Sequence, residues 1–174
     1  MKGQGLVLIN TGDGKGKSTA AFGAALRAAG HGMKVLIVQF IKSPKWRSGE
    51  LKAIQKLENV EVRTMGTGFT WNNEDIESAK RAAKEAWRFA SEKLVEGEYD
   101  LVVLDEINYA VRYGLLDVDE VIEGITGRAE GVHVILTGRG AHPKLIDLAD
   151  TVTEMVEIKH HFRMGMKSVR GIEF

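Results

Sequence analysis

Four short, unbroken runs of apolar residues mark the chain: GLVLIN (5–10), MKVLIVQF (33–40), LVVLDE (101–106) and VHVILTG (132–138). Runs of this length are typical of strands that are covered on both faces, as in a parallel sheet. The segments VEVRT (60–64) and TVTEMVEI (151–158) are weaker strand candidates. The apolar pattern therefore predicts a sheet with a strong centre and two less certain members.

Two segments between these runs have the composition and end signals of helices. An alanine-rich segment predicts a helix from Lys17 to Ala29, which we expect to end at Gly30 because glycine commonly terminates helices. The segment VDEVIEGIT (118–126) predicts another helix, with Asp117 as its N-cap.

A longer helix is predicted from about residue 74 to residue 96, with Asn72 or Asn73 as its cap. Its apolar positions recur at helical spacing, at Ile76, Ala79, Ala83, Ala86, Trp87, Ala90 and Leu94. Trp87 lies on this apolar face, so we expect it in the core.

Strands and helices alternate along the chain, which predicts an α/β fold with an open, mostly parallel sheet and right-handed crossovers. No linker or internal repeat interrupts the pattern, and we expect residues 1–174 to form a single domain. Ligands in such sheets bind at the carboxyl ends of the strands. The loops of interest therefore follow Asn10, Phe40, Leu104 and Thr137.

Composition narrows the functional classes. Lys+Arg and Asp+Glu both number 24, so the chain lacks the basic excess that is usual for a nucleic-acid-binding protein. There is no cysteine, which excludes disulfides, zinc–thiolate sites and thiol nucleophiles. No apolar stretch reaches membrane-spanning length and no signal-peptide profile is present. We therefore expect a cytoplasmic protein without nucleic-acid or membrane partners.

The stretch NTGDGKGKSTAAFG (10–23) follows the first strand and opens the first helix. It ends in the Gly-Lys-Ser of a phosphate loop, although Thr11 stands where the usual pattern has its first glycine. Glycines allow sharp turns that point backbone N–H groups at an anion, and the following helix adds its positive end. The alternative is a glycine-rich turn with surface lysines. The candidate phosphate-binding residues are Thr11, Gly12, Asp13, Gly14, Lys15, Gly16, Lys17, Ser18 and Thr19.

Two further strands end in residues that suit a phosphate site. Asp105 and Glu106 end a buried strand, where acids of phosphate-loop proteins hold Mg²⁺, and the Ser18 hydroxyl would be a third ligand. The alternative for the acids is capping of the next helix. Arg139 follows another strand and could stabilise phosphate charge, or it could be an ordinary surface arginine.

Five segments together resemble the P-loop ATP:corrinoid adenosyltransferases, that is, the cob(I)yrinic acid a,c-diamide adenosyltransferases. They are TGDGKGKSTAAFGAALRAAGHGMKVLIVQFIK, MGTGFTW, VVLDEINYAVRYGLL, ILTGRGAH and the ending GIEF, and the resemblance runs from about residue 5 to residue 174. It implies a three-layer P-loop NTPase-like (RecA-like) fold. It also implies transfer of the 5′-deoxyadenosyl group of ATP to the cobalt(I) of a reduced corrinoid, with release of triphosphate, in vitamin B12 biosynthesis or salvage.

The resemblance assigns roles to individual residues. Lys17 and Arg139 would offset charge on the departing triphosphate, with Mg²⁺ or Mn²⁺ held by Ser18, Asp105 and Glu106. Phe69 and Trp71 match the aromatic positions that the family places beneath the corrinoid to exclude a lower cobalt ligand; on spacing alone they could simply anchor a loop.

Four residues near the expected nucleotide carry open interpretations. Asp13 stands where relatives often have an uncharged polar residue, and it would repel a triphosphate unless it points outward or towards Mg²⁺. Lys15 could neutralise triphosphate or be solvated. His160 and His161 are interpreted as part of a C-terminal closure over the nucleotide.

The resemblance further implies a reduced flavoprotein as electron donor and a homodimer. Two alternatives belong to other classes. A P-loop ATPase or kinase would release orthophosphate with ADP, and a non-catalytic carrier would bind adenosylcobalamin without consuming ATP. A zinc-containing nucleoside kinase is disfavoured because the chain has no cysteine ligands.

Overall fold

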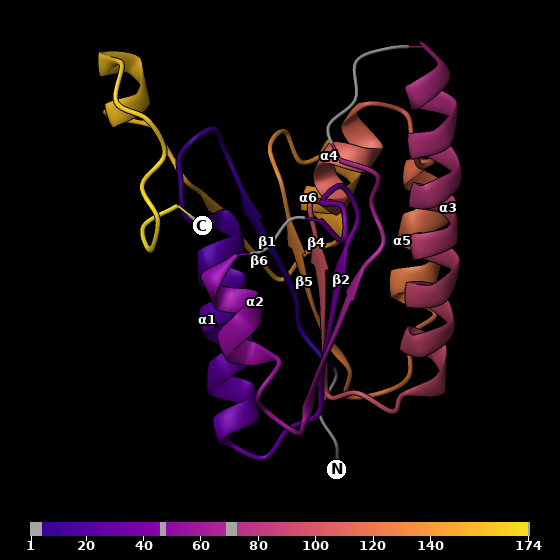
Figure 1. Cartoon of the computed structure of the whole chain (residues 1–174). Helices are drawn as coiled ribbons and strands as arrows, with labels where there is room; N and C mark the ends of the chain where they lie inside the picture. The colour runs from indigo at the N-terminus through magenta and orange to yellow at the C-terminus, as the bar shows by residue number, and fades with distance from the viewer. Residues whose placement is uncertain (1–4, 46–47, 69–72, 174) are drawn as a thin grey trace.

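The computed structural model describes residues 5–45, 48–68 and 73–173. Within them, six parallel strands form one sheet in the order β3-β2-β4-β5-β1-β6 (Figure 1). The strands are β1 (Val7–Thr11), β2 (Val35–Gln39), β3 (Val60–Thr64), β4 (Leu101–Asp105), β5 (His133–Thr137) and β6 (Thr151–Glu154). The four strong apolar runs are the inner strands, and the two weaker candidates are the edges.

Six α-helices and a short 3₁₀ helix connect and cover the strands of this described part of the chain. They are α1 (Lys17–Gly30), α2 (Gly49–Ile54), α3 (Asn73–Glu96), α4 (Ile107–Arg112), α5 (Val118–Thr126), α6 (Pro143–Leu148) and η1 (His161–Met164). The three predicted helices are confirmed, as is the Asp117 cap, whose Oδ1 accepts a hydrogen bond from the Asp119 amide at 2.7 Å. Helix α1 runs one residue further than expected, and the left-handed glycine after it is Gly32 (φ +79°), not Gly30.

The sheet lies between two helical layers because the side chains of its inner strands alternate between two cores. Figure 1 shows α1 and α2 on one face and α3 and α5 on the other. In β2, Val35 and Ile37 pack with α1 and α2, whereas Leu36 and Val38 pack towards α3, α4 and α5. Trp87 is buried in the second core, as its place on the apolar face of α3 predicts.

The parallel register brings the carboxyl ends of four strands to one edge of the sheet. Asn10 of β1 pairs with Thr137 of β5, and Gln39 of β2 pairs with Asp105 of β4. The loops that the sequence singled out therefore lie next to one another, as expected for a ligand site at a sheet edge.

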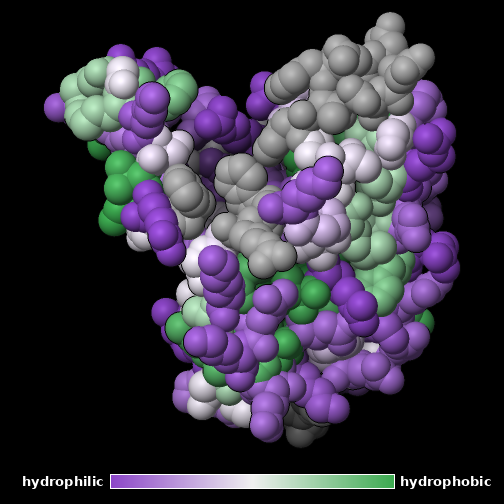
Figure 2. Space-filling view, in the orientation of Figure 1, coloured by the Kyte–Doolittle hydropathy of each residue, from purple (hydrophilic) through white to green (hydrophobic). Residues whose placement is uncertain are grey.

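Strand β6 is shorter than predicted because the chain leaves the sheet at Met155. From there, residues 155–173 (the C-terminal segment) extend away from the sheet on the side of α1 (Figure 1). Several large apolar side chains of this segment are exposed, Ile158 at 95% and Val156 at 70%, and Figure 2 shows hydrophobic side chains on this projecting part of the molecule. Among the described residues, no helix combines the length and hydrophobicity needed to cross a bilayer.

Candidate functional site

The loop between β1 and α1 has the backbone of a phosphate loop. Gly12 and Gly16 adopt positive φ angles of +93° and +117°, which side-chain-bearing residues rarely adopt. Gly16 is the N-cap of α1 and, lacking a side chain, makes no capping bond to the first amides of the helix. The exposed amide end of α1 therefore faces the loop, as an anion site requires.

The backbone at Met155 packs so closely against this loop that two loop positions have no room for a side chain. A Cβ at Gly12 would lie 2.4 Å from the Met155 carbonyl oxygen, and a Cβ at Gly14 would lie 2.7 Å from the same atom. The Gly14 amide donates to this oxygen at 2.6 Å. The absence of side chains at Gly12 and Gly14 thus lets the backbone after β6 pack against the loop. Because the Gly14 amide donates to Met155, it is turned away from any bound phosphate.

Lys17 lies in the first turn of α1 and is 8% exposed. Its ammonium donates to the Gly14 carbonyl at 2.5 Å, which folds the side chain back over the loop. Burial lowers the pKa of Lys17, and the Glu106 carboxylate opposes this shift. A buried cation is stabilised more strongly by a nearby anion than an exposed cation is. Lys17 is therefore suited to hold a phosphate group.

Thr11, which stands at the position of the usual first glycine, has a structural role. Its hydroxyl accepts a hydrogen bond from the Ala141 amide at 3.1 Å, and the side chain is largely buried. This contact ties the end of β1 to the loop after β5. The positive φ angle that a glycine would have supplied is provided by Gly12.

We expect Thr11→Val to lower the free energy of unfolding by about 1 kcal/mol, because the Ala141 amide loses its acceptor. Thr11→Ser keeps the hydroxyl and is the matched control. Urea unfolding of both variants measures the difference. An unchanged free energy of unfolding in Thr11→Val, which keeps the methyl group and lacks the hydroxyl, would show that the hydrogen bond does not contribute.

Asp105 ends β4 and is completely buried. Its Oδ1 accepts from the Thr137 hydroxyl at 2.9 Å, and its Oδ2 accepts from Gln39 Nε2 at 2.9 Å and from Lys42 Nζ at 3.2 Å. Sequence reasoning missed Gln39 and Lys42. The register that pairs Gln39 with Asp105 could have indicated the first, and Lys42 follows the same strand. Both carboxylate oxygens therefore already have protein partners.

Glu106, unlike Asp105, lines a cavity beside the loop. Its φ of +66° is the only positive value among non-glycine residues of the described chain, and its side chain makes no capping bond to α4. Its amide donates to the Thr137 hydroxyl, which fixes the turn. Burial and the adjacent Asp105 raise the pKa of Glu106, whereas Lys42, Lys17 and Arg139 oppose the rise. The left-handed turn directs this carboxylate among three cations.

The raised pKa of Glu106 predicts how stability changes with pH. Above the ordinary glutamate value of 4.5, the folded state holds the Glu106 proton more tightly than the unfolded state does, so stability falls as pH rises. Glu106→Gln removes this fall. We expect it to stabilise the ligand-free protein at neutral pH by about 1 kcal/mol, the usual size for one substitution.

Urea unfolding at a series of pH values measures this difference, with the exposed Glu58→Gln as control. Parallel pH profiles for wild type and Glu106→Gln would contradict the prediction.

A cavity of about 520 Å³ opens beside the loop. It is lined by Asp13, Lys17, Glu106, Tyr109, Arg112, Tyr113 and Arg139. The sequence analysis missed Tyr109 and Arg112 of α4 and Tyr113, which directly follows this helix. Their spacing, at positions 109, 112 and 113 directly after the Asp-Glu pair, places them on one face of a helix at the same sheet edge. The cavity thus has two tyrosine rings 4.2 Å apart on one wall and three cationic side chains around it.

Comparison with known proteins then identifies the family. Residues 3–174 match the sequence model of the ATP:corrinoid adenosyltransferase BtuR/CobO/CobP family. The chain belongs to this family. The corrinoid adenosyltransferase of Pseudomonas aeruginosa is 45% identical over 171 residues, with 98% of this chain and 84% of that protein covered. The corrinoid adenosyltransferase of Escherichia coli is 44% identical over 171 residues, with 98% and 86% covered.

Solved structures confirm the expected fold of this corrinoid adenosyltransferase family member. A KaiC-like protein of Pyrococcus horikoshii has a TM-score of 0.50 at 16% identity, covering 90% of this chain and 75% of that one. EssC (ATPases 2 and 3) of Geobacillus thermodenitrificans has a TM-score of 0.51 at 16% identity, covering 97% and 36%. At this identity the likeness shows the three-layer P-loop NTPase-like (RecA-like) fold alone.

The structure brings most of the residues predicted for the corrinoid adenosyltransferase site to one sheet edge. Arg139 and Asp13 both line the cavity, and the Arg139 Nε lies 3.9 Å from Asp13 Oδ1, so that the acid has a countercharge. Lys15, in contrast, contacts the C-terminal segment. Phe69 and Trp71 lie outside the described residues.

Proposed function

We propose that this chain transfers the 5′-deoxyadenosyl group of ATP to the cobalt(I) of a reduced corrinoid, in vitamin B12 biosynthesis or salvage. The cobalt electron pair attacks C5′ and forms a cobalt–carbon bond, while the C5′–O bond breaks and inorganic triphosphate leaves with the electron pair of the broken bond. Family membership over residues 3–174 makes the chain a transferase and is the observation that carries the proposal.

The residues around the cavity suit the charge that this displacement creates. Negative charge grows on the departing triphosphate, and Lys17, Arg112 and Arg139 all line the cavity where it would lie. Cobalt(I) is itself a strong nucleophile, so no general base is needed at the attacking atom. The phosphate loop would then hold the leaving group and would not present a phosphorus atom for attack.

Mg²⁺ or Mn²⁺ would supply further countercharge to the triphosphate. Glu106 fits as a direct ligand because its carboxylate faces the cavity, and Ser18 lies in the first turn of α1 beside Lys17. Asp105 fits less directly, since its oxygens already accept from Thr137, Gln39 and Lys42. Its proposed role is to position the neighbouring Glu106.

Phe69 and Trp71 are proposed to fill the space beneath the corrinoid and exclude a lower cobalt ligand, because the GTGFTW motif matches the family pattern. Loss of a lower ligand makes cobalt(II) easier to reduce. A reduced flavoprotein as electron donor, a homodimer and a cytoplasmic location complete the proposal.

This role predicts that Trp71→Ala will act mainly on reduction. We expect a rate loss of about tenfold or more when the reaction starts from cobalt(II), and a smaller loss with chemically pre-reduced cobalt(I). Each tenfold step corresponds to about 1.4 kcal/mol. Optical detection of the cobalt–carbon bond measures both rates, and Trp87→Phe, in the core, serves as a control for general damage. Equal losses of rate from cobalt(II) and from cobalt(I) would contradict a role of Trp71 in reduction.

The decisive test of function is anaerobic incubation with ATP, Mg²⁺ and chemically reduced corrinoid, followed optically for the cobalt–carbon bond and chemically for the phosphate products. Inorganic triphosphate formed in step with adenosylated corrinoid supports the proposal. Orthophosphate and ADP without a cobalt–carbon bond would instead identify an ATPase or kinase. Binding of adenosylcobalamin with no consumption of ATP would identify a carrier.

A further inference from the structure

The two lysines of the GKGK motif line different cavities. Lys17 faces the 520 Å³ cavity described above. Lys15 lines a second cavity of about 350 Å³ together with residues of the C-terminal segment, which are Val156, Glu157, Ile158, Lys159, His160 and His161. The phosphate loop therefore has a second polar face, which the proposed adenosyl transfer does not use.

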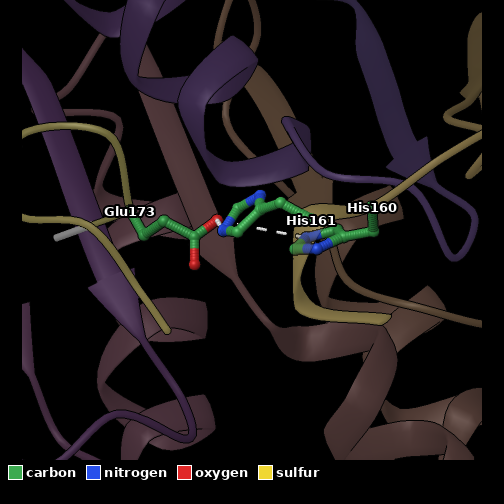
Figure 3. Close-up of side chains that lie close together, drawn as sticks. All are labelled: His160, His161 and Glu173. Atoms are coloured by element: carbon green, nitrogen blue, oxygen red, sulfur yellow. Dashed lines mark ion pairs between the residues drawn. The ribbon is translucent and has the colours of Figure 1, made fainter. Parts of the chain in front are cut away.

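A carboxylate from the end of the C-terminal segment occupies this face. Glu173 Oε1 lies 3.2 Å from Lys15 Nζ, 3.7 Å from His161 Nε2 and 4.0 Å from His160 Nε2. Figure 3 shows both imidazole rings on the same side of the Glu173 carboxylate. The Glu173 side chain is only 16% exposed, although it lies next to the end of the chain.

The hydrogen bonding of His160 separates this cluster from a metal site. His160 Nδ1 accepts a hydrogen bond from the Phe162 amide at 3.2 Å, so the proton of the neutral ring is on Nε2, the atom that faces Glu173. A metal bound at this Nε2 would have to displace that proton or break the cap of η1. The Lys15 ammonium on the same carboxylate further disfavours a second cation.

The Glu173 carboxylate does not form hydrogen bonds with all of the three side chains that surround it, Lys15, His160 and His161. Of the three, only Lys15 is within hydrogen-bonding distance of Oε1. His161 Nε2 is shielded from solvent and has no hydrogen-bond partner among the described residues. Lys159 adds a further cation to the cavity wall, whereas Glu157 of the same wall pairs with Arg163. The three side chains all face the same carboxylate oxygen, Oε1 of Glu173. A phosphate group has several acceptor oxygens and could bond each of these side chains separately.

We propose that Lys15, His160 and His161 form a second anion site that binds a phosphate group of a free polyphosphate, with Glu173 as its internal occupant. The choice of inorganic triphosphate as ligand rests on the proposed function, of which it is the product. Binding displaces Glu173 and frees the end of the C-terminal segment from the phosphate loop. The site thus couples the presence of released product to the position of this segment.

The test uses Lys17→Ala protein, in which the main phosphate site is weakened, and titrates it with inorganic triphosphate while the ¹⁵N-labelled histidine side chains are followed by NMR. We expect shifts of the His160 and His161 signals with saturation. Adding Glu173→Gln removes the internal competitor and should tighten binding several-fold, whereas adding His161→Gln should weaken it about tenfold, or 1.4 kcal/mol. His31→Gln, at the far end of α1, is the matched control.

Unchanged His160 and His161 signals at millimolar triphosphate would overturn the proposal, as would an affinity indifferent to Glu173→Gln. A response to Zn²⁺ but not to triphosphate would also overturn it and point to a metal site. No corrinoid is present in this titration, so its outcome is independent of adenosyl transfer. Conversely, failure of the anion site would leave formation of the cobalt–carbon bond unaffected.

Discussion

We expect Lys17→Ala to lower kcat/KM for formation of the cobalt–carbon bond by about 1,000-fold, the effect of removing one preorganised charge from a transition state. Lys17 is buried beside the amide end of α1 and its ammonium is held by the Gly14 carbonyl, so it is positioned before ATP arrives. Stopped-flow or steady-state absorbance under anaerobic conditions, with pre-reduced corrinoid and varied ATP, measures the loss.

Lys56→Ala, which changes an exposed lysine after α2, is the control for this prediction. If Lys17→Ala raised KM for ATP but left kcat intact, the ammonium would bind the ground state and the transition state equally. A variant with full kcat/KM would show that the triphosphate does not lie in this loop.

The second large effect is expected on stability. Asp105→Ala should lower the free energy of unfolding by about 3–5 kcal/mol, because it leaves the Lys42 ammonium without its buried partner. Gln39 and Thr137 also lose their acceptor in this variant. Urea or thermal unfolding of the ligand-free protein measures the change without reference to activity.

Asp119→Ala provides a matched control for this prediction. Asp119 pairs with Lys144 at 2.6 Å, but both side chains are more than half exposed, so the pair should contribute less than about 1 kcal/mol. Similar losses for the two substitutions would show that burial of the Asp105 pair adds nothing. Loss of activity in Asp105→Ala without loss of stability would instead favour a direct metal contact.

The sequence predicted the architecture well where the signal was local. Continuous apolar runs identified the inner strands, because residues such as Val102 and Val103 are buried on opposite faces of the same strand. The helices α2, α4 and α6 were missed. Each has six residues, which is too short to establish a helical period.

The candidate site was predictable only in part. The loop glycines, Lys17 and Glu106 are all recognisable because their spacing along the chain carries the signal. The approach of Met155 to Gly12 and the pairing of Lys42 with Asp105 depend on which strands become neighbours. Local composition does not predict such contacts between distant segments, so they could be identified only in the folded structure.

The order of strands in the sheet also bears on how the protein is made. β1 is synthesised first, yet it lies between β5 and β6, which are synthesised last. During synthesis, neither edge of β1 can therefore pair until β5 and β6 have emerged from the ribosome. The turn after β1 gains its Ala141 and Met155 contacts only after β5 and β6 have been made, so its geometry depends on both later strands.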